Sequence, residues 1–326
     1  MAKKILGIDL GGTSVKFAII SDEGEILEKW TIATNILEDG KHIVPNIIQS
    51  IQEHLERYQL TKDDFLGIGM GSPGKVDAEN GTVIGAYNLN WRTLQKVRED
   101  FETALGMPFY IDNDANVAAL GEQWKGAGNG ERDVVMFTLG TGVGGGVVSN
   151  GQLVRGAGGA AGEVGHLTVE IQNGFNCTCG KKGCLETVAS ATGILNLARA
   201  FAEEYVGDSP IKEKIDNGDE LSAKTIFDEA KLGDFFANEI VNRFAQYLGL
   251  GCSHIANTLN PSAIVIGGGV SGAGEFLLEK INQYYQEYTF PQIRDVSKLV
   301  LAQLGNDAGV IGAAQLVKLQ LQTTNA

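Results

Sequence analysis

The segment Lys4-Ile-Leu-Gly-Ile-Asp-Leu-Gly-Gly-Thr13 begins as an apolar run and ends in a glycine turn. A second apolar run, residues 15–20, follows that turn directly. Two such runs joined by a short turn predict a β-hairpin. Ser21-Asp-Glu-Gly24 forms a further turn, and residues 25–33 are predicted to be a third strand. The sequence therefore predicts that the chain opens with a β-meander.

The same order of features returns near residue 140. Residues 134–139 are predicted to form a strand, residues 140–146 form a glycine loop, and residues 145–148 lead into a second strand. Asn150-Gly151 is typical of a tight hairpin turn. The repetition predicts two related α/β halves with a cleft between them, and the boundary is expected near residues 115–130.

The remaining periodic segments complete the two halves. Apolar side chains at helical spacing predict a helix over residues 41–58, and a buried strand is predicted at 65–70. A strand at 107–111 precedes a helix at 115–124, and the tail is predicted to be helical over residues 306–321. The predicted domains are residues 1–116, with the C-terminal helix at about 309–326 packing back on them, and residues 117–308.

The first glycine turn is a candidate nucleotide site. Gly11 and Gly12 let backbone N–H groups approach a phosphate, and Thr13 adds a hydroxyl. Asp9 would repel a phosphate unless a cation lay between them, so its position indicates Mg²⁺. A plain Asp-Gly hairpin turn explains the same residues without a ligand, and this alternative stays open.

The second glycine loop matches the G-x-G-x-x-G pattern of dinucleotide-binding folds through Gly140, Gly142 and Gly145. The acidic Glu163 lies further along the chain, as that pattern requires. However, the pattern also requires a helix directly after the loop, and here a strand and a tight turn follow. A second hairpin phosphate loop that includes Thr141 fits the sequence better.

A third glycine cluster, Gly267-Gly268-Gly269, lies between an apolar strand and a predicted helix. Such a position suits the adenosine or a phosphate of a nucleotide. A tight strand-to-helix turn without a ligand is the alternative.

Three of the four cysteines gather in one short segment, at Cys177, Cys179 and Cys184, and His166 precedes them. Three thiols and one imidazole form a Cys₃His set that suits a tetrahedral Zn²⁺ site. Cys177 and Cys179 are too close in sequence for an easy disulfide. Four protein ligands leave no open position for water, so the predicted zinc is structural. A redox-active or solvent-exposed thiol cluster is the alternative.

Asp112-Asn-Asp114 lies between a predicted strand and a predicted helix. Phosphoryl transfer to a hydroxyl group needs a base that accepts the hydroxyl proton. Asp114 is the candidate base, and it is expected to stay ionised because the helix dipole favours its charge. Ordinary N-capping of the helix by Asn113 or Asp112 is the alternative.

Glu163, His166 and Glu186 are the remaining polar candidates. Carboxylates and imidazoles hold sugar hydroxyls well because they accept or donate hydrogen bonds in fixed directions. If one ring nitrogen of His166 binds zinc, the other can meet a sugar oxygen, and zinc would lock the loop that carries these residues. Asn88 is a further candidate for a sugar hydroxyl. For each glutamate, a solvated surface carboxylate is the alternative.

Composition narrows the class of protein. The 326 residues are 43% hydrophobic and 20% charged, which is typical of a soluble globular chain. The formal net charge of −14 disfavours binding to nucleic acid or to anionic lipid. The sequence shows no secretory segment and no apolar run of about 18 residues. The expected location is the cytoplasm.

The whole chain resembles the ROK family of sugar kinases, and most closely its bacterial glucokinases. The resemblance implies an α/β protein with the actin-like ATPase (ribonuclease H-like) fold, two α/β domains around a closing cleft, and ATP-dependent phosphorylation of glucose to glucose 6-phosphate. The order and spacing of the shared motifs run from one end of the chain to the other. These motifs are Asp9-Leu-Gly-Gly-Thr13, Leu139-Gly-Thr-Gly-Val-Gly-Gly-Gly146, Glu163-Val-Gly-His166, Cys177-x-Cys179-Gly-x-x-Gly-Cys184-x-Glu186 and Ile266-Gly-Gly-Gly-Val270.

The resemblance also implies roles for individual residues, with Asp114 as the general base and a homodimer or homotetramer as the assembly. The implied sugar contacts are Gly74, Asn88, Asn113, Asp114, Glu163, His166 and Glu186. The implied contacts of ATP with its Mg²⁺ are Asp9, Gly11, Gly12, Thr13, Lys16, Gly140, Thr141, Gly142, Gly267, Gly268 and Gly269. The implied structural Zn²⁺ ligands are His166, Cys177, Cys179 and Cys184.

Several alternatives remain open within the family. Kinases for fructose, mannose and N-acetylmannosamine share much of the same residue set, and polyphosphate remains an alternative phosphoryl donor. The family also contains transcriptional repressors with an added N-terminal DNA-binding segment, but here the first strand begins by residue 4 and the chain is acidic. A sugar-binding sensor is a further alternative, which the intact Asp114 and the phosphate loops disfavour.

Overall fold

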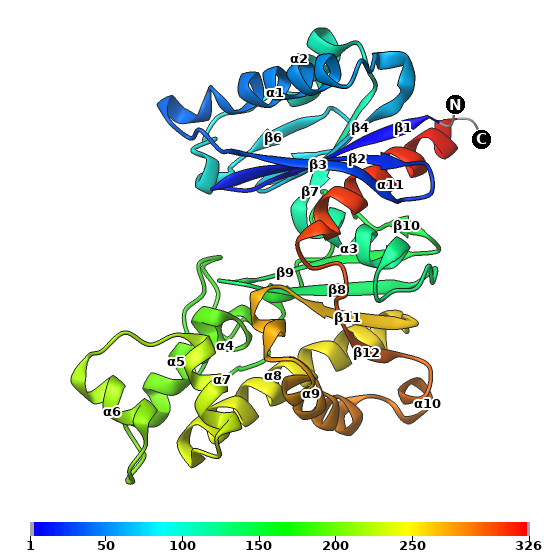
Figure 1. The fold of residues 1–326 in the computed structure, drawn as a ribbon. Helices are drawn as coiled ribbons and strands as arrows, with labels where there is room; N and C mark the ends of the chain where they lie inside the picture. The colour runs from blue at the N-terminus through cyan, green and yellow to red at the C-terminus, as the bar shows by residue number, and fades with distance from the viewer. Residues whose placement is uncertain (1–2, 325–326) are drawn as a thin grey trace. The chain divides into compact units, whose positions relative to one another are not determined.

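The computed structural model of the protein describes residues 3–324 and contains two five-stranded sheets and a small two-stranded one (Figure 1). The contacts divide the chain into two compact units. The first comprises the described residues up to Arg132, Gly146–Ala161 and the residues from Leu304 onward, and the second comprises Asp133–Gly145 and Gly162–Gln303. The domain boundary predicted between residues 116 and 117 stays a prediction.

The first five-stranded sheet has the order β3-β2-β1-β4-β7. Its antiparallel part is formed by β1 (Lys4–Leu10), β2 (Ser14–Ser21) and β3 (Ile26–Ala33), which confirms the predicted meander. β4 (Phe65–Ser72) pairs in parallel with β1, and β7 (Phe109–Asn113) pairs in parallel with β4. The carboxyl ends of β1, β4 and β7 therefore meet at one edge of the sheet.

Successive side chains of β1 point to opposite faces of this sheet, as the pleat of a strand requires. Ile8 belongs to a core that it shares with α1 (Ile43–Arg57) and α2 (Val97–Leu105). Ile5 belongs to a separate core that it shares with α11 (Ala308–Thr324). Accordingly, α1 and α2 cover one face of the sheet and α11 covers the other (Figure 1).

Glycines let α11 approach β4 and α3 (Asp114–Lys125) backbone to backbone. A Cβ atom on Gly69 of β4 would lie 1.9 Å from the Ala313 carbonyl oxygen. A Cβ atom on Gly312 would lie 1.7 Å from the Val117 carbonyl oxygen. No side chain fits such gaps, so glycine at these positions sets how closely the last helix packs.

The second five-stranded sheet has the order β10-β9-β8-β11-β12. β9 (Val143–Ser149) begins shortly after β8 (Val134–Leu139) ends, and β10 (Gln152–Leu153) pairs antiparallel with β9. β11 (Ala263–Gly267) pairs in parallel with both β8 and β12 (Lys298–Leu301). The strand, glycine loop and strand predicted near residue 140 are thus present.

The helices of the second unit pack around α8, which contacts α4, α5, α7 and α9. In Figure 1, α8 and α9 lie on the same side of the second sheet. The small sheet, β5 (Lys75–Asp77) with β6 (Thr82–Ile84), belongs to the first unit. The helices of the second unit are α4 (Glu186–Ala189), α5 (Ala191–Ala202), α6 (Pro210–Asn217), α7 (Ala223–Lys231), α8 (Phe235–Leu259), α9 (Glu275–Tyr288) and α10 (Pro291–Arg294).

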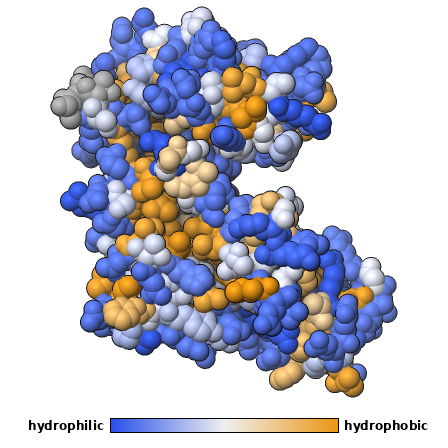
Figure 2. Space-filling model, turned by 180° about the vertical axis from the view of Figure 1, so that it is seen from behind, coloured by the Kyte–Doolittle hydropathy of each residue, from blue (hydrophilic) through white to orange (hydrophobic). Residues whose placement is uncertain are grey.

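Among residues 3–324, no helix combines the length and the apolar character needed to cross a membrane. The face shown in Figure 2 is mostly hydrophilic. Such a surface agrees with the formal net charge of −14. Large apolar side chains such as Phe17, Phe101 and Phe137 are fully buried instead.

Replacement of Gly312 by alanine tests the close packing of α11. The added methyl group would meet the Val117 carbonyl oxygen at 1.7 Å, so the helix must shift. Overpacking of this kind lowers the free energy of unfolding by about 1–3 kcal/mol, which urea denaturation measures. Gly158→Ala is the matched control, because no described atom beyond its chain neighbours lies within 4 Å of a Cβ there. Wild-type stability of Gly312→Ala would contradict the packing.

Candidate active site and metal centre

The first glycine turn joins β1 to β2. Asp9 lies opposite Lys16 in the strand register, and Lys16 Nζ is 3.1 Å from Asp9 Oδ2. The Gly11 N–H closes the turn by donating to the Ser14 carbonyl oxygen, and Thr13 is exposed. The turn therefore presents a carboxylate, an ammonium group and a hydroxyl group together. This set suits a phosphate that carries a divalent cation.

Asn88 lies directly beside this turn. It belongs to the 3₁₀ helix η3 (Tyr87–Leu89), and a Cβ atom on Gly12 would lie 3.3 Å from the Asn88 carbonyl oxygen. Gly74 has a positive φ of 91°, and a Cβ atom there would lie 2.8 Å from Ala86 Cβ. The structure thus brings Asn88 to the first turn, and it requires glycine at position 74 for backbone reasons alone.

The end of β7 and the start of α3 carry Asn113 and Asp114. Asn113 Oδ1 accepts a hydrogen bond of 3.0 Å from the Ala115 N–H, so the capping alternative holds for this residue. Capping uses the side-chain oxygen, whereas the amide NH₂ group is a separate donor. Helix capping and contact with a substrate are therefore compatible at Asn113.

The Asp114 carboxylate lies where its charge is disfavoured. Burial is the main cause that raises the pKa of Asp114 above its ordinary value, and the nearby charge of Asp9 adds to it. The hydrogen bond from the Ala115 N–H acts in the opposite direction. A helix start alone predicts a lowered pKa, so desolvation here outweighs the helix terminus. A raised pKa brings a carboxylate closer to the range in which a general base works best.

The second glycine loop lies between β8 and β9. The Gly140 N–H donates to the Gly142 carbonyl oxygen over 3.0 Å, much as Gly11 closes the first turn. A strand rather than a helix follows the loop, so the dinucleotide-binding alternative is excluded. The hairpin form of the second loop is confirmed, and its contact with a phosphate stays a prediction.

A cavity of about 570 Å³ lies against this loop within the second unit. Gly140, Thr141 and Gly269 line it, so the second and third glycine clusters meet at one place. Its volume falls within the range of small-molecule sites. The rest of the lining comprises Ala191, Ser222, Ala223, Lys224, Phe227, Asp228, Lys231, Val270, Gly272 and Ala273.

Five of the thirteen lining residues come from α7, which no motif marks. Lys224, Phe227 and Lys231 share one face of α7 through their spacing. That spacing was the only sequence feature from which this part of the cavity could have been predicted. Periodicity identifies a face of a helix but not what the face borders.

Within the second and third glycine clusters, three of the predicted nucleotide contacts lie outside the lining of this cavity: Gly142, Gly267 and Gly268. A Cβ atom on Gly142 would lie 2.6 Å from Glu186 Oε2, so this glycine admits the Glu186 carboxylate. Gly268 has a φ of 84°, and a Cβ atom there would lie 2.5 Å from the Leu139 carbonyl oxygen. Close packing explains both of these glycines without a ligand.

Glu163, His166 and Glu186 lie together in the second unit. His166 Nε2 is 3.9 Å from Glu163 Oε2, and His166 Nδ1 is 3.9 Å from Glu186 Oε1. Glu163 precedes the 3₁₀ helix η4 (Val164–His166), and Glu186 begins α4. The three side chains expected to act together are therefore neighbours, with His166 in the middle.

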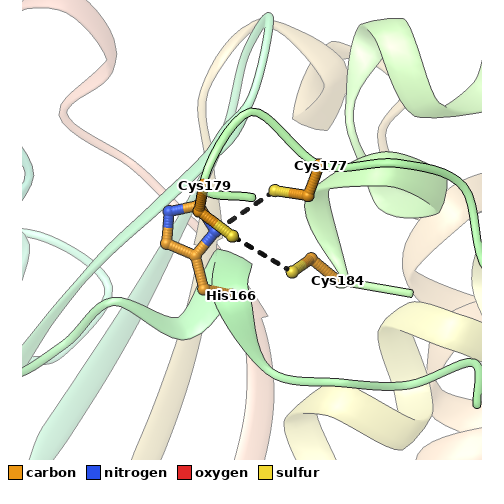
Figure 3. Close-up of side chains that lie close together, drawn as sticks. All are labelled: His166, Cys177, Cys179 and Cys184. Atoms are coloured by element: carbon orange, nitrogen blue, oxygen red, sulfur yellow. Dashed lines mark hydrogen bonds between the residues drawn. The ribbon is translucent and has the colours of Figure 1, made fainter. Parts of the chain in front are cut away.

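The predicted zinc ligands converge on one point (Figure 3). The ligand atoms of His166, Cys177, Cys179 and Cys184 all lie within 4.8 Å of one another. Cys179 Sγ is 3.7 Å from Cys184 Sγ, and Cys177 Sγ is 3.6 Å from His166 Nδ1. In a tetrahedral site with Zn–S bonds of about 2.3 Å, neighbouring sulfurs are about 3.8 Å apart. The residues present thus fit a Zn²⁺ ion.

The local backbone explains how the chain forms this cluster. The Cys177 N–H donates to the Lys181 carbonyl oxygen over 2.8 Å, and the Gly180 N–H donates back to the Cys177 carbonyl oxygen over 3.0 Å. Gly183 has a φ of 73°, and a Cβ atom there would collide with the Glu170 carbonyl oxygen. The glycines of the cysteine motif therefore allow the turn that gathers the thiols.

The ROK family model matches residues 5–320, and the chain belongs to the ROK family. A glucokinase of Halalkalibacterium halodurans is 45% identical over 315 residues, which are 97% of this chain and 95% of that protein. A ROK hexokinase from Thermus thermophilus has a TM-score of 0.83 at 30% identity, with 98% of this chain and 99% of that chain covered. A ROK family glucokinase from Streptomyces griseus in complex with glucose and AMPPNP has a TM-score of 0.75 at 32% identity, over 97% and 99% of the chains. The predicted α/β class and actin-like ATPase fold are thereby confirmed.

Replacement of Cys179 by serine tests the metal centre. Wild-type protein is expected to contain stoichiometric zinc, and the variant is expected to lose most of it and to unfold at a lower temperature. Elemental analysis and thermal denaturation measure the two effects. Cys252→Ser is the matched control, because Cys252 is a buried thiol outside the cluster, and it should keep its zinc. Wild-type protein purified without zinc would refute the site.

Replacement of Asp114 by asparagine tests the desolvation of this carboxylate. Because the folded-state pKa of Asp114 is raised, its ionised form destabilises the fold at a pH above that pKa. We therefore expect the variant to be more stable than wild type at neutral pH, and the gain should shrink as the pH falls through the raised pKa toward the ordinary aspartate value. Thermal denaturation across this range measures it, with the exposed Asp63→Asn as control. A variant less stable than wild type at neutral pH would contradict the effect.

Proposed function

We propose that the protein is an ATP-dependent glucokinase, which transfers the terminal phosphoryl group of ATP to glucose and releases glucose 6-phosphate and ADP. The observation that carries the proposal is the half-buried, desolvated Asp114 carboxylate in the field of Asp9. Both residues lie at the carboxyl ends of parallel strands of one sheet, β7 and β1, with β4 between them. A base and a cation-binding carboxylate held in this way match what phosphoryl transfer to a hydroxyl requires.

In the proposed reaction, Asp114 accepts the proton of the sugar 6-hydroxyl while that oxygen forms its bond to the phosphorus atom. The bond between this phosphorus and the bridging oxygen of ATP breaks, and ADP leaves with that oxygen. Mg²⁺, when bound with ATP, offsets the negative charge of the phosphates. Asp9 and Lys16 lie close enough together to hold that cation and a phosphate oxygen.

We further propose that the sugar is held by side chains that donate and accept hydrogen bonds in fixed directions. The proposed side chains are those of Asn88, Asn113, Asp114, Glu163, His166 and Glu186, and Gly74 is proposed to contribute its backbone. His166 directs Nδ1 at Cys177 Sγ and Nε2 toward Glu163, so one nitrogen suits the metal and the other the sugar. The proposed Zn²⁺ then fixes the imidazole ring rather than taking part in the chemistry.

The cavity of about 570 Å³ is the proposed site of the adenosine. Phe227 and Val270 would offer apolar surface to the base, and the Thr141 hydroxyl, at the border of the cavity, is proposed to bind a phosphate. The first glycine turn, from Asp9 to Thr13, is proposed to meet the terminal phosphate. Thiols kept free for metal ligation suit a reducing compartment, so we propose a cytoplasmic protein, and we propose that it forms a homodimer or homotetramer.

A coupled assay of ADP release with Mg-ATP tests this function. Wild-type protein is compared on glucose, mannose, fructose, N-acetylglucosamine and N-acetylmannosamine, and we expect glucose to give the highest kcat/KM. Asp114→Asn should lower kcat by about 10²–10⁴-fold, because it removes the proton acceptor while keeping the shape of the side chain.

The exposed Asp63→Asn is the control for this variant, and circular dichroism checks that the fold is retained. Near-normal turnover by Asp114→Asn would remove Asp114 as the base. Turnover of another hexose but not of glucose would support a sugar kinase and would reject glucose as its substrate. Wild-type protein that turns over no hexose would reject the proposed function in favour of a sugar-binding regulator.

A further inference from the structure

Asp112 is a buried carboxylate two residues before the proposed base, Asp114. It is 3% exposed, and its carboxylate accepts hydrogen bonds from the Asn113 N–H at 2.8 Å and from Asn116 Nδ2 at 2.9 Å. Its other oxygen accepts from Arg155 Nε over 2.6 Å, and this contact supplies the positive charge. A buried carboxylate needs such a partner to remain ionised in a folded protein.

Arg155 lies where its main chain also constrains a loop. It follows β10, and its carbonyl oxygen accepts a hydrogen bond of 3.0 Å from the Ala161 N–H. That bond closes a loop in which Gly156 and Gly159 have φ values of 71° and 73°. Glu163, a proposed sugar ligand, follows Ala161 closely along the chain. Arg155 therefore binds Asp112 at the end of β7 through its side chain and closes the loop through its carbonyl oxygen.

We propose that Arg155 is a positioning residue for the phosphoryl transfer, an inference that rests on the proposed function. Arg155 holds Asp112 in place and thereby fixes the direction in which Asp114, two residues along the chain, presents its carboxylate. The planar guanidinium group is suited to this task because it directs its N–H bonds in a rigid geometry, which the ammonium group of lysine lacks. The same contact anchors the loop that leads to Glu163.

A purely structural ion pair is the competing explanation, and the chain offers a way to separate the two. Removal of one partner from a buried pair destabilises a protein, whereas replacement of both partners by neutral residues is often close to neutral. If Arg155 positions Asp114, the double variant should recover thermal stability but not kcat. Arg155 also borders a cavity of about 360 Å³, so shorter or uncharged side chains fit at this position without a clash.

The test compares Arg155→Met, Arg155→Lys and the double variant Asp112→Asn/Arg155→Met with wild type. We expect Arg155→Met to lower kcat on glucose by about 100-fold, the effect of a small misalignment of reacting groups, while the KM for ATP stays unchanged. Arg155→Lys should fall between this variant and wild type. The double variant should regain the thermal midpoint of wild type while its kcat stays low.

Arg98→Met is the matched control. The Arg98 guanidinium donates to the carbonyl oxygens of Ala78, Glu79 and Phe109 in the same unit, so its loss should lower stability without a comparable fall in kcat. Recovery of kcat together with stability in the double variant, or an equal loss of kcat in Arg98→Met, would overturn the positioning role. Normal turnover by Arg155→Met would also overturn the positioning role, but it would leave the proposed kinase function standing. Wild-type protein that phosphorylates no hexose would overturn both.

Discussion

The backbone contact of α11 with its neighbours is the constraint on which the first unit depends. Glycines remove the side chains that would hold the helix away from β4 and from α3. The same helix reaches the edge of the sheet where β1 ends, because a Cβ atom on Gly309 would lie 2.7 Å from Asp9 Cγ. It also packs along α3, which begins with Asp114. One packing contact thus fixes the strand end that carries Asp9 and the helix that carries Asp114.

This packing holds together groups that repel one another. Asp9 and Asp114 are both carboxylates, and the field of Asp9 adds to burial in raising the pKa of Asp114. Two of the nearby carboxylates have cationic partners that reduce the repulsion, since Asp9 pairs with Lys16 and Asp112 pairs with Arg155. The first unit therefore gathers negative charge where a substrate with its cation is proposed to bind. The packing of α11 offsets the electrostatic repulsion between these carboxylates.

The sequence predicted the features that depend on neighbours along the chain. Apolar runs and glycine turns located most strands of the two five-stranded sheets, although no strand was predicted at β12. The spacing of Cys177, Cys179 and Cys184 identified the cluster that fits a metal ion. It did not predict contacts that tertiary packing alone creates, such as Arg155 with Asp112 or the face of α7 at the cavity. The expectation for Asp114 considered the helix dipole but not desolvation, which raises the pKa of Asp114, because local sequence shows a helix start but not burial.

The long segment between β10 and α4 gives a physical reason to expect a metal ion beside the proposed sugar contacts. Across residues 154–185 of the described chain, η4 is the sole helix or strand, so little regular hydrogen bonding orders the backbone. A loop of this length carries a large conformational entropy, which a substrate would otherwise have to overcome on binding. A Zn²⁺ ion held by His166 and three thiols would order the loop before the sugar arrives. The residues proposed to recognise the sugar would then already face it, and more of the binding energy would remain for the transition state.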